Sequence, residues 1–178
     1  MAGKLITFYG CMFAGKTTAL LNHIQSSDYK LSEILILKPS LDFRAGLDFI
    51  KTHDGKSIAC NSIERDSNID ELITPFTKLI AIDEAQFFDK IFYADLKRFL
   101  AKGINIAAAG LDKDYLARPF GLMPLLMQMA ADNHELFAKC NVCGTLANYT
   151  YRKADNKVLV LIGAENYYEA RCETCYHL

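Results

Sequence analysis

The sequence has no long hydrophobic run and no excess of charge of either sign. No apolar stretch approaches the roughly 20 residues that a membrane-spanning helix needs, and the N-terminus carries no signal-peptide pattern. The formal net charge is -1, from 20 basic and 21 acidic residues, which argues against a surface built to bind a nucleic-acid backbone. We therefore expect a cytoplasmic protein that binds neither membrane nor nucleic acid.

Internal repeats, low-complexity linkers and a disordered composition are also missing. Of the 178 residues 51% are hydrophobic, so a packed core is feasible. The length suits one ordinary domain, or one domain with a small appendage. Six cysteines are present, and without a secretion signal we interpret them as reduced thiols or metal ligands rather than as disulfides.

Short β-rich apolar runs alternate with helical stretches through most of the chain. Strands are predicted at 5–9, 34–37, 79–82 and 104–109, and helices at 16–25, 93–101 and 122–133. Ile34–Leu37 and Leu79–Ile82 have the continuous hydrophobicity of strands that are buried on both faces. Gly103 closes one helix, and Pro124 suits the first turn of another. The alternation predicts an α/β fold, a parallel sheet flanked by helices.

The stretch from Gly10 to Thr17 (Gly-Cys-Met-Phe-Ala-Gly-Lys-Thr) matches the phosphate-loop pattern G-x-x-x-x-G-K-[ST], between a predicted strand and a predicted helix. The glycines permit a tight loop of inward N–H groups, and the helix N-terminus adds partial positive charge. Lys16 can reach the terminal phosphates of ATP, and Thr17 offers a hydroxyl ligand to Mg²⁺. A chance glycine turn is the alternative, and the matching context disfavours it. The predicted nucleotide-binding residues are Gly10, Cys11, Met12, Phe13, Ala14, Gly15, Lys16, Thr17 and Thr18.

Two carboxylates, Asp83 and Glu84, directly follow the predicted strand 79–82. In a parallel sheet the carboxyl ends of the strands form the edge where ligands bind. Asp83 is suited to hold Mg²⁺, directly or through water. Glu84 is suited to take the proton that an acceptor hydroxyl loses when a new P–O bond forms. Two alternatives remain: Glu84 could polarise water in an ATPase, and both residues could cap the next helix.

Two Cys-x-x-Cys pairs lie on either side of residues 144–171: Cys140 with Cys143, and Cys172 with Cys175. Four thiolates satisfy the tetrahedral preference of Zn²⁺ and leave no position open for chemistry, so this pattern favours a structural zinc site. Reduced thiols, a redox pair, and a site in which a histidine replaces one cysteine are the alternatives.

The character of the chain changes at about Lys139, where polar and β-prone residues take over. We predict a phosphate-loop domain over 1–138 and a small zinc-ribbon-like domain over 139–178. A basic stripe in the second domain would have favoured a phosphate-loop ATPase whose zinc unit binds nucleic acid or a protein partner. Acidic residues nearly offset the basic ones there.

Together these motifs resemble the type II, zinc-containing thymidine kinases over nearly the whole chain. The matching stretches are 10–17, Thr52-His53-Asp54-Gly55, Ile82–Phe88, Ala109–Asp112, Pro119-Phe120-Gly121 and 164–176. The resemblance implies a kinase that transfers the γ-phosphate of ATP to the 5′-hydroxyl of thymidine, with deoxyuridine as a second acceptor. It also implies a homotetramer and feedback inhibition by thymidine triphosphate.

The resemblance also assigns roles to residues. Glu84 corresponds to the catalytic base of the family, Asp83 to its magnesium-associated acid, Asp42 to an acidic residue and Arg44 to a phosphate-contacting arginine. The implied nucleoside pocket contains Met12, Phe87, Leu111, Tyr115, Phe120, Thr150, Val160 and Tyr167. The segment between the cysteine pairs resembles a lasso that covers the base through main-chain groups and is anchored by zinc. Without the family, a solvated surface position is an equal alternative for Arg44, and most of the pocket residues are more typical of a core.

The chain departs from the family pattern at four positions. Cys11 stands where proline is usual in the phosphate loop, and Ala45 where an aromatic residue is common. Ala164 replaces a glycine, and Tyr115 stands where phenylalanine is frequent. None of these changes removes a group to which a catalytic role is assigned.

Overall fold

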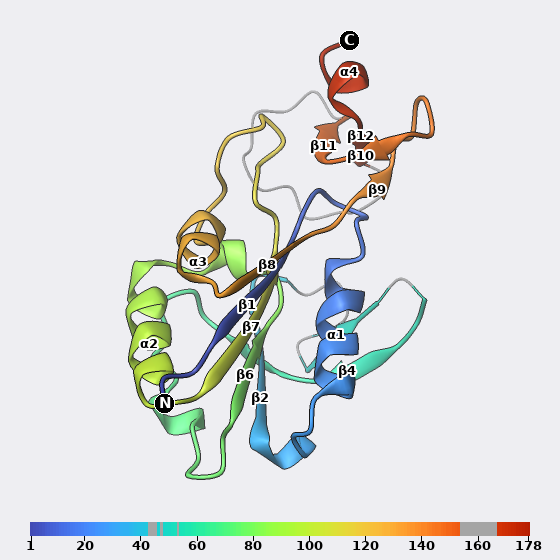
Figure 1. Cartoon of the computed structure of the whole chain (residues 1–178). Coiled ribbons are helices and arrows are strands. Elements are labelled where there is room, and N and C mark those ends of the chain that lie inside the picture. Colours follow the sequence, from blue (N-terminus) through green and yellow to red (C-terminus); the bar gives the residue numbers. More distant parts are fainter. Residues whose placement is uncertain (43–45, 47, 53, 154–166) are drawn as a thin grey trace.

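A six-stranded parallel sheet forms the centre of the computed structural model, which describes residues 1–42, 46, 48–52, 54–153 and 167–178 (Figure 1). The strand order is β5-β2-β6-β7-β1-β8, and every neighbouring pair is parallel. The strands of this sheet are β1 (Leu5–Tyr9), β2 (Ile34–Pro39), β5 (Asn61–Ile63), β6 (Leu79–Ile82), β7 (Asn105–Gly110) and β8 (Asp132–Glu135). The predicted α/β fold is confirmed.

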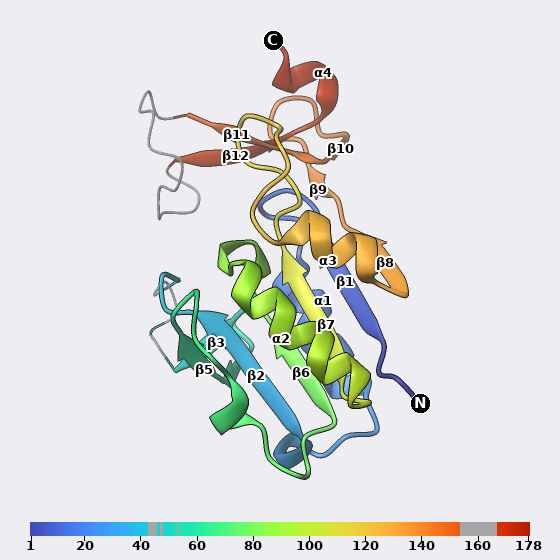
Figure 2. The same cartoon turned by 90° about the vertical axis from the view of Figure 1, so that its left-hand side faces the viewer.

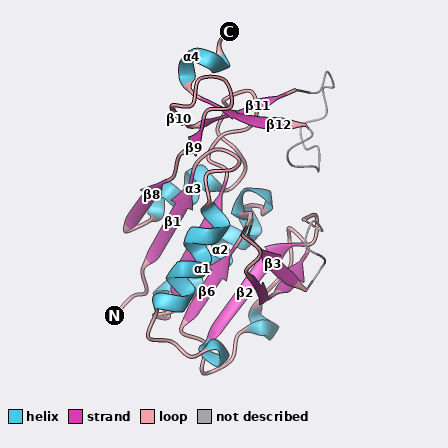
Figure 3. Ribbon diagram, turned by 90° about the vertical axis from the view of Figure 1, so that its right-hand side faces the viewer, coloured by secondary structure: helices cyan, strands magenta, loops and turns pink. Residues whose placement is uncertain are grey.

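Helices cover both faces of the sheet. The α-helices are α1 (Lys16–Ser26), α2 (Lys90–Ala101), α3 (Met123–Met129) and α4 (Glu173–Tyr176), and the 3₁₀ turns are η1 (Leu31–Glu33), η2 (Asp70–Leu72) and η3 (Ala85–Phe87). Figure 2 shows α2 and α3 in front of one face, and Figure 3 shows α1 in front of the other. None of the helices in the described part of the chain is long and apolar enough to cross a membrane.

Three antiparallel strand pairs complete the chain. They are β3 (Phe49–Lys51) with β4 (Ser57–Ala59), β9 (Ala138–Lys139) with β10 (Leu146–Ala147), and β11 (Tyr149–Arg152) with β12 (Tyr168–Arg171). The last two pairs and α4 form a small unit beyond the carboxyl edge of the sheet (Figure 1). The small C-terminal unit that the cysteine pairs predicted is therefore present.

The central strands are buried on both faces because consecutive side chains enter two different hydrophobic clusters. In β7, Ile106 and Ala108 pack with α2 and α3, whereas Ala107 and Ala109 pack with the α1 residues Leu20, Leu21 and Ile24. Small side chains allow a helix to approach a strand closely. The alanines of β7 therefore let α1 lie low over the sheet, and α1 carries the end of the phosphate loop.

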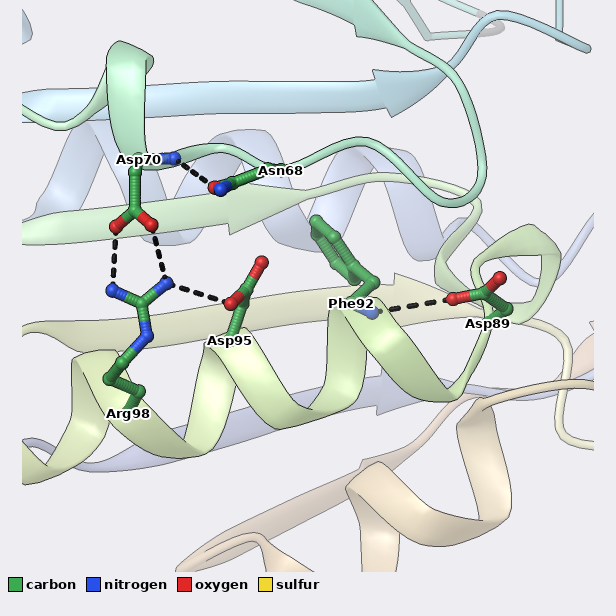
Figure 4. A network of polar contacts seen from close by, with 6 residues as sticks. All are labelled: Asn68, Asp70, Asp89, Phe92, Asp95 and Arg98. Carbon is green, nitrogen blue, oxygen red and sulfur yellow. Dashed lines mark hydrogen bonds and ion pairs between the residues drawn. The ribbon is translucent and has the colours of Figure 1, made fainter.

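Helix α2 is fixed at both ends by carboxylates (Figure 4). Asp89 caps its N-terminus, where an Oδ1 atom accepts the backbone N–H of Phe92 at 3.3 Å. Near the other end, the Arg98 guanidinium donates to both carboxylate oxygens of Asp70, at 2.6 and 2.9 Å, and to Asp95 at 2.7 Å. These contacts stabilise both ends of the helix.

The helix predicted over 122–133 is wrong in its last four residues, 130–133. The helix ends at Met129, and Asp132–Glu135 instead form β8, an edge strand beside β1. The backbone N–H groups of Ala131 and Leu136 donate to carbonyls of β1, and Thr7 donates its hydroxyl to Asn133. Aspartate and asparagine are weak helix formers, so pairing with an open sheet edge overrides the helical periodicity.

We expect Phe92→Ala to destabilise the fold by about 3–5 kcal/mol, because truncation leaves a cavity in the core. Phe92 is fully buried and stacks on Phe88 with ring centroids 4.1 Å apart. Ile91 is the matched control, because it lies on the same helix turn but is exposed; Ile91→Ala should cost no more than about 0.5 kcal/mol. Urea denaturation measures both, and equal losses would contradict this packing.

Candidate functional site

The phosphate loop joins β1 to α1 at the carboxyl edge of the sheet. Gly10 has a φ of 144°, and a Cβ atom there would lie 2.1 Å from the carbonyl oxygen of Leu136. Gly15 has a φ of 79° and caps α1. Both motif glycines therefore occupy positions where a side chain would be strained or would clash. Between them, Phe13 also adopts a left-handed conformation, with a φ of 67°.

Lys16 is the cation of this loop. Its ammonium donates a hydrogen bond to the carbonyl of Cys11 at 2.7 Å. Burial lowers the pKa of Lys16, and the nearby carboxylates of Glu84 and Asp83 partly oppose this shift. A cation that has lost hydration gains more from an anionic ligand than an exposed one does, because the local dielectric constant is low. Lys16 is therefore suited to contact phosphate oxygens.

Thr17 and Asp83 bring two distant segments together. The Thr17 hydroxyl lies 3.2 and 3.1 Å from the two carboxylate oxygens of Asp83. Asp83 is buried, and its backbone N–H donates to the carbonyl of Leu37. The pair spans the position of β7, which separates β1 from β6 in the sheet. A hydroxyl and a carboxylate in contact offer the oxygen ligands that Mg²⁺ prefers.

Glu84 follows Asp83 in an unusual backbone conformation. Its φ of 52° lies in the left-handed region, which residues other than glycine seldom adopt. Its carbonyl accepts the N–H of Phe87 at 3.1 Å, and its side chain accepts a hydrogen bond from Gln86. Strained residues of this kind cluster at functional sites. The turn directs Glu84 away from the path of β6, next to the predicted magnesium ligand.

Several residues predicted for the nucleoside pocket come together in the structure. The backbone N–H of Met12 donates to the Thr150 hydroxyl at 3.0 Å. The rings of Phe87 and Phe120 meet edge to face, with centroids 5.7 Å apart. Leu111, at the end of β7, is linked to the same turn, since its N–H donates to Gln86.

Two other predicted pocket residues lie in the C-terminal part of the site. The carbonyl of Tyr115 accepts the hydroxyl of Tyr176 at 2.8 Å, and the Arg152 guanidinium lies 3.6 Å from the centroid of the Tyr115 ring. Tyr167 is 40% exposed, and its carbonyl accepts the N–H of Lys153 at 2.8 Å. Tyr115 therefore docks against the C-terminal unit, and Tyr167 lies where β12 begins.

Some predicted residues lie outside the described part of the chain. These are Arg44, Val160 and the other residues of 154–166 within the predicted lasso, together with His53 and Ala45. Asp42 is described: it follows β2, and its backbone N–H donates to the carbonyl of Pro39 at 2.9 Å. Asp42 thus lies near the carboxyl end of its strand, the edge at which the phosphate loop also lies.

Two buried polar residues were given no role of their own from the sequence. Gln86, on η3, contacts both Glu84 and Leu111. Lys38, on β2, is 1% exposed and donates to the carbonyls of Phe49 and Gly46, so it fixes the backbone at these two residues. A lysine inside an apolar strand and a glutamine inside an apolar turn were the available signals, because buried polar groups need partners.

The four paired cysteines form a compact group. Cys140, Cys143, Cys172 and Cys175 each offer a sulfur, and all four sulfurs lie within 4.8 Å of one another. The Sγ atoms of Cys143 and Cys172 are 3.6 Å apart. Zn–S bonds of about 2.3 Å at tetrahedral angles place sulfurs roughly 3.8 Å apart, so the group fits a tetrahedral metal ion. Backbone N–H groups, led by that of Cys143, lower the pKa of the Cys140 thiol, which favours the thiolate a metal requires.

The C-terminal unit packs directly on the phosphate loop. The Cys11 thiol donates to the carbonyl of Ala147 at 3.3 Å, and burial raises its pKa. Cys11 and Ala14 share one hydrophobic cluster with Cys140 and Cys175. A proline at position 11 could not donate this hydrogen bond. The departure from the family pattern thus adds a contact between the loop and the cysteine unit.

The fold and the site together define a phosphate-loop α/β protein with a four-cysteine metal-binding group. A protein-family model described as "Thymidine kinase" matches residues 3–176. The chain is 36% identical over 177 residues to a protein named "Thymidine kinase" from Mesomycoplasma hyopneumoniae (strain 7448), covering 99% of this chain and 96% of that one. It is 34% identical over 178 residues to a protein of the same name from Pseudothermotoga lettingae, covering 99% and 96%. It is 33% identical over 174 residues to a protein of this name from Porphyromonas gingivalis (strain ATCC BAA-308 / W83), an alignment that covers 98% of this chain and 85% of that one. The chain belongs to the thymidine kinase family, as its motifs indicated.

Removing one thiolate should remove the metal. We expect about one metal ion per chain in the wild type, and less than half of that in Cys143→Ser, because a hydroxyl is a poor ligand for a thiolate-binding metal. Cys60→Ser is the matched control, since Cys60 lies outside the group and burial raises the pKa of its thiol to about 11. Elemental analysis of gel-filtered protein measures the content, and a full complement in Cys143→Ser would contradict the site.

Proposed function

We propose that this chain transfers the γ-phosphate of ATP to the 5′-hydroxyl of thymidine, giving thymidine monophosphate for nucleotide salvage. Membership of the thymidine kinase family supports this acceptor. The single structural observation that supports the transfer chemistry is the contact of Thr17 with Asp83 beside Glu84. This contact joins the end of the phosphate loop to the acidic edge of the sheet.

In the proposed reaction the protein binds ATP, orients thymidine and takes the proton from the thymidine 5′-hydroxyl. The N–H groups of the phosphate loop and the ammonium of Lys16 hold the β- and γ-phosphates. Thr17 and Asp83 supply oxygen ligands for Mg²⁺, which when bound neutralises charge on the phosphates. The thymidine 5′-oxygen forms a bond to the γ-phosphorus, the bond to the ADP oxygen breaks, and Glu84 takes the hydroxyl proton. Asp42 and Arg44 complete the phosphate side of the site in this proposal.

The proposed nucleoside pocket lies between the end of β7, η3 and the C-terminal unit. Phe87, Phe120 and Leu111 supply apolar walls for a planar base, and Thr150 is fixed by its contact with Met12. Tyr115, Val160 and Tyr167 belong to the same proposed pocket. Deoxyuridine, which lacks only the 5-methyl group of the base, is a proposed second acceptor.

The proposed metal of the four-cysteine group is Zn²⁺, in a structural role. Four thiolates fill its coordination shell, so no position remains for a substrate. The cysteine pairs flank the β11–β12 hairpin, and two of the cysteines share a hydrophobic cluster with the phosphate loop. Zinc would therefore stabilise the wall of the site that the C-terminal unit provides. In this scheme residues 1–138 and 139–178 are distinct domains in close contact.

Two further properties, an oligomeric state and a form of feedback inhibition, follow from the family resemblance alone. We propose that the chain forms a homotetramer and that thymidine triphosphate inhibits it as the end product. The triphosphate joins a thymidine moiety to a polyphosphate, so it could occupy the nucleoside pocket and the phosphate loop together. We also propose a cytoplasmic location, as the sequence predicts.

Glu84→Gln should lower kcat for thymidine by roughly 10² to 10⁴-fold, the usual contribution of a general base. Binding of ATP with Mg²⁺ should be retained, since the loop and Asp83 are intact. Chromatographic measurement of thymidine monophosphate and ADP gives the rates, and a fluorescent ATP analogue gives the affinity.

The matched control is Glu33→Gln, which makes the same carboxylate-to-amide change in a residue whose carboxylate accepts a backbone N–H from Lys30, away from this edge. It should keep the wild-type rate. Release of ADP from the wild type without thymidine monophosphate would exclude the kinase. An undiminished rate in Glu84→Gln would exclude Glu84 as the base.

A further inference from the structure

Gln86 is a buried amide that none of the roles proposed above uses. It is 2% exposed and lies on η3, directly after the turn that holds Glu84. Its Nε2 donates to Oε2 of Glu84 at 2.5 Å, and its Oε1 accepts the backbone N–H of Leu111 at 3.0 Å. A carboxylate can only accept and an N–H can only donate, so a single orientation of the amide satisfies both partners.

Two glycines leave the space that Gln86 occupies. A Cβ atom at Gly121 would lie 1.7 Å from the backbone carbonyl oxygen of Gln86, and the φ of Gly121 is 54°. A Cβ atom at Gly110 would lie 2.6 Å from Oε1 of Gln86. Gly110 ends β7 and lies against the Gln86 side chain, whereas Gly121 lies just before α3 and against the Gln86 backbone, so two segments distant in sequence close around this residue.

The same amide contacts a residue in a strained conformation. Glu84 is left-handed at a φ of 52°, a conformation that persists only where surrounding contacts fix it. The carboxylate of a flexible glutamate otherwise samples several rotamers. A buried donor on its Oε2 restricts this freedom.

We propose that Gln86 is a positioning residue that sets the geometry of Glu84 with its amide NH₂ group and that of the nucleoside pocket, at Leu111, with its carbonyl group. This inference rests on the proposed function, in which Glu84 is the base and Leu111 lines the pocket. The NH₂ group then governs kcat, because a base must be held within hydrogen-bonding reach of the proton. The carbonyl group governs the KM for thymidine.

Three variants test the NH₂ group and the side-chain carbonyl group of Gln86 separately. Gln86→Met fills a similar volume and removes both hydrogen bonds. Gln86→Glu keeps an oxygen for the N–H of Leu111 but places a second carboxylate against Glu84, and two carboxylates in contact share a proton. Gly110→Ala keeps Gln86 but displaces its amide; the fold can accept this change, because the close atoms are the ends of the flexible Gln86 and Met123 side chains.

Asn105 provides a matched control at the opposite edge of the sheet. Its Oδ1 accepts the backbone N–H of Lys4 at 2.8 Å, and its Nδ2 donates to the Tyr29 hydroxyl at 2.7 Å. It therefore bridges a backbone N–H and a side-chain oxygen, as Gln86 does. Asn105→Leu should lower stability and leave kcat per folded molecule unchanged.

The experiment measures kcat and the KM values for thymidine and ATP, normalised to the folded fraction from thermal melts. For Gln86→Met we expect kcat to fall roughly 10- to 100-fold, part of what a general base contributes. Its KM for thymidine should rise about 2- to 12-fold, as for one lost neutral hydrogen bond, and its KM for ATP should stay within about twofold of the wild type. Gln86→Glu should lose kcat but keep the KM for thymidine, and Gly110→Ala should show an intermediate loss of both.

The results that would contradict this inference differ from those that would contradict the proposed function. If the wild type makes no thymidine monophosphate, the proposed function fails and this inference fails with it. If the wild type is active, and Gln86→Met and Gly110→Ala lose no more kcat per folded molecule than Asn105→Leu, Gln86 has only a structural role. A loss confined to the KM for ATP would also overturn the inference.

Discussion

The close packing of α1 over the small side chains of β7 is the constraint on which the site depends. β7 separates β1 from β6, so the phosphate loop must cross it before Thr17 can reach Asp83. Ala107 and Ala109 face α1 and keep this crossing short. On the opposite face, Gly110 leaves room for Gln86. A larger side chain in this strand would lift the helix or displace the amide, because a packed interior has little free space.

The C-terminal unit packs on the phosphate loop beyond the carboxyl edge of the sheet. Thr150 accepts the N–H of Met12, and Ala147 accepts the thiol of Cys11, so β10 and β11 both contact the phosphate loop. This unit is small, and small units need a metal or crosslinks to fold stably. The metal-binding cysteines and the nucleotide-binding loop are therefore parts of one packed structure, although they lie far apart in sequence.

Local sequence signals were sufficient to predict much of the fold and two parts of the candidate site. Periodicity and glycine position predicted β1, α1, β2, β6, α2 and β7, and the two spaced motifs predicted the phosphate loop and the cysteine group. The pairing of β8 could not be predicted in the same way, because it depends on an open sheet edge that exists only after folding. Gln86 lies in a stretch that matches the family, but its role could not be assigned for a similar reason, since its partners Glu84 and Leu111 meet only in three dimensions. The pocket residues came from family resemblance, because apolar side chains in a pocket and in a core look alike in sequence.

The central claim is that this edge of the sheet directs the γ-phosphate to a nucleoside hydroxyl and not to water. The most direct test is phosphorus NMR of the wild-type protein with ATP, Mg²⁺ and thymidine. The account predicts that ADP and the 5′-phosphomonoester of thymidine appear together in equal amounts. ADP accompanied by inorganic phosphate, with no phosphomonoester of thymidine, would contradict it.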